Sequence, residues 1–413
     1  MASSAGKQSF HRLRRLLAKK WLRINSGVTV IGVTGSYGKT NTSRAIATVL
    51  SEKFPTLQTD LNLDTVYNLP ITLLRLRPGH KFLVLEMGVD HPGDMSSYLD
   101  LVKPAIAVLT GISPVHSDEE HLGSLDGIIS EKGKLLEALS ADGWAILNGD
   151  DENVRKMASK THAKIIWYGL NLRNKEKLDV WAKVIKVDFS GTSFTLHFGD
   201  DKIDAKIGLI GRHFIQAALV ASIIGQQFGL SEEEIVRGLA KVNSLPGRLS
   251  FEKGPRGTKL LDDHLRANPA STTAGLETLA DLPAEGKKIA IMGEMGELGK
   301  YSKEEHRKIG GLVAKLGIDY LVGVGPLQKF TTGEAAKKGM KNERVFWVPD
   351  VVEASKVIRK VAQKDDLLYL KGSLLRHLER ILLLLDNRRV DCKLVSCHVY
   401  KQCPSCPKLV EGL

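Results

Sequence analysis

The sequence predicts an α/β fold with two parallel-sheet domains, the second of them Rossmann-like. Three observations support this class: β-branched runs alternate with helical segments, a glycine-rich turn follows the first run, and the alternation restarts in the second half. At 413 residues the chain also exceeds what a single hydrophobic core usually contains. We expect four segments, which are a basic amphipathic helix (1–26), a central domain (27–245), a C-terminal Rossmann-like domain (246–386) and a basic, cysteine-containing tail (387–413).

The composition is that of a soluble globular protein, with 43% hydrophobic and 26% charged residues. No apolar run in the sequence is long enough to span a bilayer. The segment from Phe10 to Ile24 lacks the unbroken apolar stretch of a signal peptide. These features predict a cytoplasmic protein.

The net charge of +12 is concentrated at the two ends of the chain. Residues 1–26 contain seven basic and no acidic residues, and residues 388–413 contain five basic and two acidic ones. The part between them is therefore nearly neutral. A nucleic-acid-binding domain would carry a basic surface of its own, so we expect no nucleic-acid partner.

The N-terminal segment predicts an amphipathic helix. Its apolar residues recur at helical spacing and form one stripe, made of Phe10, Leu13, Leu17, Trp21 and Ile24. Two uses of this stripe stay open. It can pack on the domain that follows, or it can give the protein a peripheral contact with an anionic membrane surface.

The first strand and helix of the central domain enclose a predicted phosphate loop. Val28 to Val33 is typical of a buried strand, and Ser43 to Leu50 has helical periodicity. Backbone N–H groups of a glycine turn at a helix N-terminus favour a bound anion. The residues expected to contact a nucleotide are Gly35, Ser36, Tyr37, Gly38, Lys39, Thr40 and Asn41.

Lys39 and Thr40 give this loop its chemistry. Lys39 is expected to reach the β- and γ-phosphates of ATP or GTP, and the Thr40 hydroxyl is expected to bind Mg²⁺. The alternative is an ordinary strand–turn–helix whose glycines serve only the turn. The lysine–threonine pair favours a P-loop ATPase domain.

Two more polar side chains follow predicted strands of the same domain. Strands are expected at 81–86, 105–110 and 144–147, and Glu86 and His116 come at or after the ends of the first two. Ligands of parallel sheets bind at the carboxyl ends of the strands. We therefore expect Glu86, His116 and Lys39 to converge.

The remaining segments complete the two domains. Residues 164–210 are expected to form short antiparallel strands. Ser231 is predicted to cap a helix, with Glu234 completing a capping box. The best domain boundary is Ser244 to Gly247. The strands expected beyond it are 259–261, 287–292, 320–324, 344–348 and 367–370.

Taken in order over about residues 28–380, these motifs resemble the Mur ligase family, whose members use ATP to form amide bonds in peptidoglycan precursor synthesis. The segment Thr34 to Thr40 is similar to the family's phosphate loop, and Leu85 to Gly88 to its magnesium-binding strand end. The resemblance implies that ATP and Mg²⁺ are the cofactors and that the metal ligands are Thr40, Glu86 and His116. It also implies transfer of the γ-phosphoryl group to a carboxylate, giving an acyl phosphate that an amine attacks.

The same resemblance singles out Lys132 within Glu131-Lys-Gly133. Lysines of this segment are carbamylated in many family members, and the resemblance implies catalytic roles for Lys39, Glu86, His116 and Lys132. Carbamylation needs a neutral amine and hence a lowered pKa. The alternative is a solvated helix lysine, like the neighbouring Lys134.

The family resemblance of three further segments implies that His213, Arg248 and Asp262 contact the nucleotide. For Arg248 the alternative is a plain surface arginine, and for Asp262 a turn carboxylate. The chain departs from the family pattern in two segments, one containing His213 and the other His264. Two family asparagines are replaced in Gly211 to Gln216, and the middle of a substrate-facing loop is altered in Asp262 to Pro269.

Three segments most resemble the branch of the family that adds D-alanyl-D-alanine, namely 69–74, 292–299 and 371–373. This resemblance implies that the substrate side is lined by Asn268, Glu297, Lys371 and Ser373. Only about 27 residues precede the first strand, so we expect no counterpart of the branch's N-terminal UDP-binding domain.

The expected function is an ATP-dependent ligase that adds D-alanyl-D-alanine or a similar amine to a peptide carboxylate. One alternative is a Mur-like ligase that joins a different amino acid or peptide to a non-UDP acceptor. Another is a nucleotide-binding scaffold without ligase activity. Retention of the second domain and of Glu86, His116 and Lys132 argues against a scaffold.

All four cysteines lie in the tail, at Cys392, Cys397, Cys403 and Cys406. Four clustered thiolates can hold Zn²⁺ tetrahedrally, although this spacing is not a standard one. The simpler expectation is a disordered tail with reduced thiols. Disulfides are not expected in a cytoplasmic protein.

Overall fold

The computed structural model describes residues 2–59, 65–114, 117–118, 120–392, 394, 396–397, 399 and 402–410. The chain forms two compact units. The first comprises Met1–Lys186, Ser193–Gly208 and His213–Val242, and the second comprises Val187–Thr192, Leu209–Arg212 and Asn243–Leu413.

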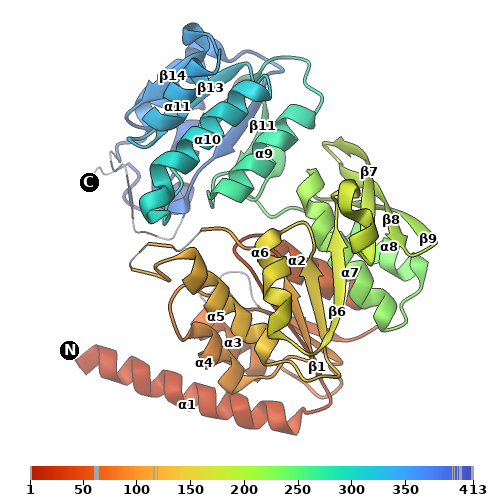
Figure 1. Ribbon diagram of the computed structural model, residues 1–413. Helices are drawn as coiled ribbons and strands as arrows, with labels where there is room; N and C mark the ends of the chain where they lie inside the picture. The colour runs from red at the N-terminus through yellow and green to blue at the C-terminus, as the bar shows by residue number, and fades with distance from the viewer. Residues whose placement is uncertain are drawn as a thin grey trace. The chain divides into compact units, whose positions relative to one another are not determined.

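The first unit is built on a sheet whose strand order is β2-β3-β1-β4-β5-β6-β7-β8-β9 (Figure 1). Neighbouring strands pair in parallel from β2 through to β7. The strands are β1 (Thr29–Thr34), β2 (Thr56–Gln58), β3 (Phe82–Glu86), β4 (Ile106–Leu109), β5 (Trp144–Asn148), β6 (Lys164–Gly169), β7 (Val180–Asp188), β8 (Gly191–Phe198) and β9 (Asp201–Ile207).

Helices cover both faces of this sheet, which is why its central strands are apolar throughout. One face packs on α3, α4 and α5, and the other on α2 and α7. The helices are α1 (Ala2–Ile24), α2 (Lys39–Leu50), α3 (Thr65–Leu74), α4 (Asp94–Leu101), α5 (Leu125–Glu137), α6 (Glu152–Met157), α7 (Ile215–Gln227) and α8 (Glu232–Ala240). Helix α8 begins with the predicted capping box, in which Ser231 and Glu234 each accept a backbone N–H of the other.

The prediction of antiparallel strands over residues 164–210 is wrong for the first of them. Strand β6 pairs in parallel with β5, with Ile166 opposite Ile146. Two-residue turns join β7, β8 and β9, as in antiparallel hairpins. The side chains at the start of β6 are only partly buried, so its sequence resembles that of a half-exposed antiparallel strand.

Helix α1 packs on α3 and α4 through a face that differs from the predicted stripe. Ala18 is completely buried, and its small side chain permits a close approach. Trp21 is partly buried and donates from Nε1 to the Leu76 carbonyl at 2.9 Å. Arg15 donates to the Ser97 carbonyl of α4 at 2.8 Å.

Most of the predicted stripe remains exposed. Of its members only Trp21 packs, and the others lie about a quarter-turn or more away from Ala18 around the helix. The exposed members are Phe10, Leu13, Leu17 and Ile24. Within the described part of the chain, no helix combines the length and the apolar character that a membrane span requires.

The second unit contains a sheet of order β10-β11-β15-β12-β13-β14 (Figure 1). It is parallel except for β10, which pairs antiparallel with β11. Helices α12 and α13 cover one face, and α9, α10 and α11 lie along the other. The elements are β10 (Ser250–Lys253), β11 (Lys259–Asp263), α9 (Pro269–Asp281), β12 (Lys288–Met292), α10 (Ser302–Lys315), β13 (Tyr320–Val324), α11 (Gln328–Lys337), β14 (Val345–Val348), α12 (Val351–Val361), β15 (Leu367–Lys371) and α13 (Glu379–Leu385).

The described residues of the C-terminal segment pack on this unit. Cys403 and Leu409 are buried and form a small apolar cluster with Leu383 of α13. Cys392 is buried as well. The expectation of a disordered tail is therefore wrong for these residues, because their apolar side chains find a surface beside α13.

Candidate active site

The phosphate loop joins β1 to α2 at the carboxyl edge of the first sheet. Gly38 precedes α2 with φ of +76°, a conformation that glycine adopts without strain. At Gly35 a Cβ atom would lie 2.1 Å from Oγ1 of Thr110, so this position has no room for a side chain. Lys39 begins α2, and its Nζ donates to the Gly35 carbonyl at 2.8 Å. The lysine thus spans the loop that a phosphate would enter.

Neighbouring strands hold the loop in place. The Ser36 N–H donates to the Gly111 carbonyl at 2.7 Å, and the Ser36 hydroxyl donates to the Ser113 carbonyl at 3.0 Å. The Tyr37 hydroxyl donates to Oδ2 of Asp151 at 3.0 Å. Burial, followed by the charge of Asp151, raises the pKa of Tyr37, so it remains a neutral donor.

Thr110 and Asp151 are supports that the sequence analysis did not single out. Thr110 Oγ1 donates to the Tyr37 carbonyl, and Asp151 also accepts the Ile112 N–H at 2.8 Å. Thr110 is the last residue of the predicted strand 105–110, and Asp151 lies four residues after the predicted strand 144–147. Their position at the carboxyl edge of the predicted sheet is the sequence signal that could have identified them as supports of the loop.

Two oxygen ligands suited to Mg²⁺ meet beside the loop. The Thr40 hydroxyl donates to Oε1 of Glu86 at 3.2 Å, and Glu86 stands at the end of β3. The Thr59 hydroxyl accepts the Glu86 N–H at 2.8 Å and fixes that strand end. A hydroxyl and a carboxylate are hard oxygen donors, so the pair fits Mg²⁺. His116 lies outside the described residues.

Lys132 lies inside the first unit on α5, with only 3% of its surface exposed. Burial, followed by the charge of Lys39, lowers the pKa of Lys132 to about 7, although Asp90 and Asp94 oppose this shift. Its Nζ contacts the Val89 carbonyl at 3.4 Å. A buried amine with a pKa near neutrality is partly uncharged at pH 7, as carbamylation requires.

Lys134 has a different environment. Its Nζ donates to Oε2 of Glu131 at 2.6 Å, and about a third of its side chain is exposed. Residues two positions apart point in different directions around a helix. Lys132 is therefore buried inside the unit, whereas Lys134 lies near the surface in an ion pair with Glu131.

Two other predicted nucleotide contacts belong to the first unit. Asn41 is half-buried in the first turn of α2. His213 lies in a short 3₁₀ helix (Arg212–Phe214), where its ring packs on Phe214 with centroids 3.9 Å apart.

In the second unit, Lys371 forms a buried ion pair. Its Nζ lies 2.6 Å from Oδ2 of Asp263, and only 1% of the Lys371 side chain is exposed. The Tyr369 hydroxyl donates to the same carboxylate oxygen at 3.3 Å. Burial raises the pKa of Asp263 and lowers that of Lys371, whereas their mutual attraction opposes both shifts. The charge of Arg248 acts on both members of the pair.

Asp262 belongs to a second buried cluster. Its Oδ1 lies 2.6 Å from Nδ1 of His264, whose Nε2 is 3.8 Å from Oε2 of Glu379. Burial lowers the pKa of His264, but the two carboxylates outweigh it and raise the pKa overall. His264 lies in the altered part of the loop from Asp262 to Pro269, so this departure from the family pattern falls inside the cluster.

The other predicted substrate residues have separate local positions. Asn268 caps α9, accepting the Ser271 N–H at 2.8 Å. Glu297 has φ of +60°, and Ser373 immediately precedes a 3₁₀ helix (Leu374–Arg376). Asn268, Glu297 and Ser373 thus belong to three different loops of the second unit.

A phosphate loop, a Thr–Glu oxygen pair and a second parallel-sheet unit define a class of two-unit, P-loop nucleotide-binding proteins. Residues 33–225 match the Mur ligase middle domain, and residues 247–374 match the glutamate ligase domain of Mur ligases. The chain belongs to the Mur ligase family, a family of ATP-dependent ligases. The predicted fold class and the family resemblance are confirmed.

Named relatives support this assignment. The UDP-N-acetylmuramoyl-tripeptide–D-alanyl-D-alanine ligase of Escherichia coli K12 is 34% identical over 306 residues, which are 74% of this chain and 66% of that enzyme. The Bacillus subtilis 168 enzyme of the same name is 30% identical over 368 residues, 88% of this chain and 77% of that enzyme. A crystal structure of MurF from Acinetobacter baumannii gives a TM-score of 0.81 at 28% identity, covering 92% of this chain and 81% of that one. The chain thus spans about two thirds to four fifths of these relatives.

Proposed function

We propose that this chain is an ATP-dependent ligase that joins D-alanyl-D-alanine, or a similar amine, to the peptide carboxylate of a peptidoglycan precursor. The observation that carries the proposal is the buried Lys132 beside a phosphate loop whose Thr40 and Glu86 form an oxygen pair. The relatives named for this reaction support the choice of substrates. A cytoplasmic location, where ATP is available, is part of the proposal.

The reaction proceeds in two steps. A carboxylate oxygen of the acceptor attacks the γ-phosphorus of ATP, so that ADP leaves and an acyl phosphate forms. The amine then attacks the acyl carbon, inorganic phosphate leaves, and the nitrogen loses a proton. Both steps depend on positioning and on neutralising phosphate charge. Mg²⁺, when bound, supplies part of that neutralisation.

The residues of the first unit divide this work. Backbone N–H groups of the loop bind the phosphates, apart from the Ser36 N–H, which donates to Gly111, and the Lys39 ammonium approaches the transferred group. Thr40 and Glu86 would hold Mg²⁺, with His116 as a further proposed ligand. Lys132, carbamylated by CO₂, supplies an anion in place of a cation and so supports the metal side of the site.

The residues of the second unit are proposed to serve the substrates. Arg248 provides positive charge beside the Lys371–Asp263 ion pair, whose own charges cancel, and Lys371 remains a proposed substrate contact. His213, Asp262, Asn268, Glu297 and Ser373 remain proposed contacts on the strength of the family resemblance.

A Mur-like ligase with a different acceptor is the second candidate. The observation that favours it is the His264 cluster, which occupies part of a loop that faces substrate in the family. A nucleotide-binding scaffold is less well supported, because burying Lys132 costs free energy that a scaffold has no use for.

Helix α1 supports a further proposal, a peripheral contact with an anionic membrane. Between 49% and 74% of each side chain is exposed in the apolar group made of Phe10, Leu13, Leu16, Leu17 and Ile24. Basic residues of the same helix flank this group. An exposed apolar face with flanking lysines and arginines is typical of helices that lie at a membrane surface.

The test of the enzymatic proposal is phosphate release from ATP by the full chain. UDP-N-acetylmuramoyl-tripeptide and D-alanyl-D-alanine are supplied separately and together, and the product is identified by mass spectrometry. Release that requires both, with the pentapeptide product, supports the proposed reaction. A parallel assay replaces the UDP-linked tripeptide by other peptide carboxylates, and release that requires one of these supports the second candidate. Nucleotide binding without acceptor-dependent release under any of these conditions overturns the proposal.

A further inference from the structure

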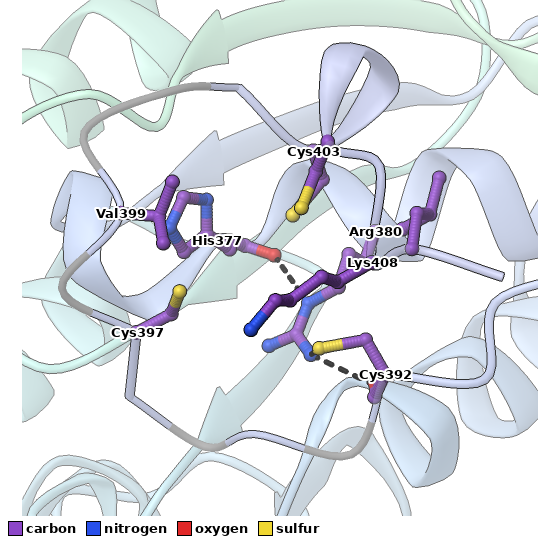
Figure 2. A pocket seen from close by; sticks show the side chains of 9 residues that line it. His377, Arg380, Cys392, Cys397, Val399, Cys403 and Lys408 are labelled. Carbon is purple, nitrogen blue, oxygen red and sulfur yellow. Dashed lines mark hydrogen bonds between the residues drawn. The ribbon is translucent and has the colours of Figure 1, made fainter. Parts of the chain in front are cut away.

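A cavity in the second unit gathers all four cysteines of the chain around a buried histidine (Figure 2). Its lining includes His377, Arg380 and the four cysteines at 392, 397, 403 and 406. None of the four takes part in a disulfide among the described residues. His377 precedes α13, whereas the cysteines follow it, so chain folding rather than sequence proximity brings them together. No step of the proposed ligase reaction uses these groups.

His377 is arranged like a metal-binding histidine. It is 2% exposed, and its Nδ1 lies 2.9 Å from Oε1 of Glu379. Its other nitrogen, Nε2, meets no hydrogen-bond partner among the described residues. A carboxylate that accepts the proton of Nδ1 leaves the lone pair of Nε2 available, which is the usual arrangement behind a histidine that binds a metal.

The same carboxylate also positions Cys403. Oε1 of Glu379 accepts the Cys403 N–H at 2.9 Å. Ligand atoms of His377, Glu379 and Cys403 all lie within 4.8 Å of one another. Tetrahedral zinc sites place neighbouring ligand atoms about 3.5 to 4 Å apart, so one nitrogen of the His377 ring and the Cys403 sulfur lie near the separation that such a site needs.

Cys397 and Cys406 also line this cavity. Cys406 is three residues after Cys403, in the C-x-x-C spacing that lets two thiolates bind one metal. The Cys397 N–H donates to the Leu375 carbonyl at 2.8 Å, which ties Cys397 to the turn that carries His377. Figure 2 shows the Cys403 sulfur to the right of the His377 ring and the Cys397 sulfur below it.

Cys392 differs from the other three cysteines. Nη1 of Arg380 donates to its carbonyl at 3.0 Å and lies 3.6 Å from its sulfur. This sulfur already has a cationic partner, so it is the cysteine least suited to bind a metal cation.

We propose that the second unit binds one Zn²⁺ through Cys397, Cys403, Cys406 and Nε2 of His377. Three thiolates and one Zn²⁺ leave a net charge of −1, and the cations that line the cavity, Arg380 and Lys408, offset it. The ion would fasten the C-terminal segment to the turn between β15 and α13. Glu379 acts as the positioning residue that orients His377.

The test measures the zinc content of the full chain, purified without chelator from zinc-supplemented medium. One zinc per chain is expected for the unaltered protein and for Cys392→Ser, the matched control. Cys403→Ser and His377→Ala should lose it. His377→Cys should retain it, because a thiolate replaces the imidazole, and this variant separates ligand loss from misfolding.

Two further measurements sharpen the result. Cobalt-substituted protein should show sulfur-to-metal charge-transfer absorption that weakens in Cys397→Ser but not in Cys392→Ser. Glu379→Gln should reduce zinc affinity about 10- to 100-fold. Absence of zinc from the unaltered protein, a disulfide between Cys403 and Cys406, or loss of zinc in Cys392→Ser with retention in Cys397→Ser would each overturn the proposal.

Discussion

The phosphate loop of the first unit and the buried polar cluster of the second unit are built in opposite ways. The loop is one continuous segment, Gly35 to Thr40, and its shape follows from glycine conformations at the start of a helix. The cluster combines side chains from separate elements, namely Asp262, Asp263, His264, Lys371, His377 and Glu379. A local motif can therefore be recognised before the fold is known, whereas the cluster exists only once β11 and β15 are in register.

Replacing Lys39 by alanine breaks the local side of this comparison and should have the largest effect. Acceptor-dependent phosphate release should fall about 10²- to 10³-fold, because a preorganised charge at the transferred phosphoryl group is lost. The thermal unfolding midpoint should change little, since no apolar core contact is removed. Lys156→Ala, an exposed lysine of the same unit, is the control. Full activity in a folded Lys39→Ala protein would contradict the phosphate-loop assignment.

Replacing Asp263 by asparagine removes the buried ion pair with Lys371, which tests the cluster that depends on tertiary structure. Lys371 would then keep a buried charge without its anionic partner, which costs about 3–5 kcal/mol of unfolding free energy. Urea unfolding of the full chain measures the loss. The double variant Asp263→Leu/Lys371→Met should be more stable than Asp263→Asn, because it removes both charges. If the single variant loses less than about 1 kcal/mol, the ion pair is not desolvated.

Lys132 depends on both local sequence and tertiary structure. It is recognised from a short sequence motif, whereas its pKa is lowered by burial in the folded unit. Its pKa is lowered to about 7 from the ordinary lysine value, so the amine is mainly protonated at pH 6 and mainly neutral at pH 8. Only the neutral amine adds CO₂. At fixed dissolved CO₂, turnover should therefore rise about tenfold from pH 6 to pH 8, as the neutral fraction does.

Variants of α5 distinguish Lys132 from its neighbour. Lys132→Ala should lose turnover but still bind ATP, since the phosphate loop is untouched, and small carboxylates should partly restore activity. Lys134→Ala should be nearly silent, because that lysine pairs with Glu131 near the surface. The reverse pattern would show that the wrong lysine of α5 has been assigned.

The smallest expected effect concerns α1, in which one face packs and another stays exposed. Leu13→Ser/Leu17→Ser should weaken binding to vesicles of phosphatidylglycerol and phosphatidylcholine several-fold, since about two apolar side chains leave the interface. Ile185→Ser, which changes an equally exposed residue of β7, is the control and should have no effect. If the unaltered chain does not bind these vesicles in a sedimentation assay, helix α1 serves only to pack on α3 and α4.

The sequence by itself determined the features that depend on neighbouring residues. The strand–loop–helix around Gly35 and Gly38, the capping box of Ser231 and Glu234 and most parallel strands of both sheets were predicted close to their observed positions, whereas the short β2 and the edge strand β10 were not predicted. Glycine conformations, caps and apolar periodicity are set within a few residues. The family resemblance followed from these same segments.

Only the tertiary structure decided which surfaces meet. Periodicity predicted an apolar stripe on α1, but it did not predict which face of the helix packs. The packed face is the one that carries Ala18, because this small side chain permits the closest approach. Periodicity also left β6 resembling an antiparallel strand, although its partner β5 runs parallel to it. Burial of Lys132 beside the charge of Lys39 and the meeting of His264, His377 and Glu379 depend on contacts between distant elements. Strand register and desolvation produce these contacts, and neither is a property of a short stretch of sequence.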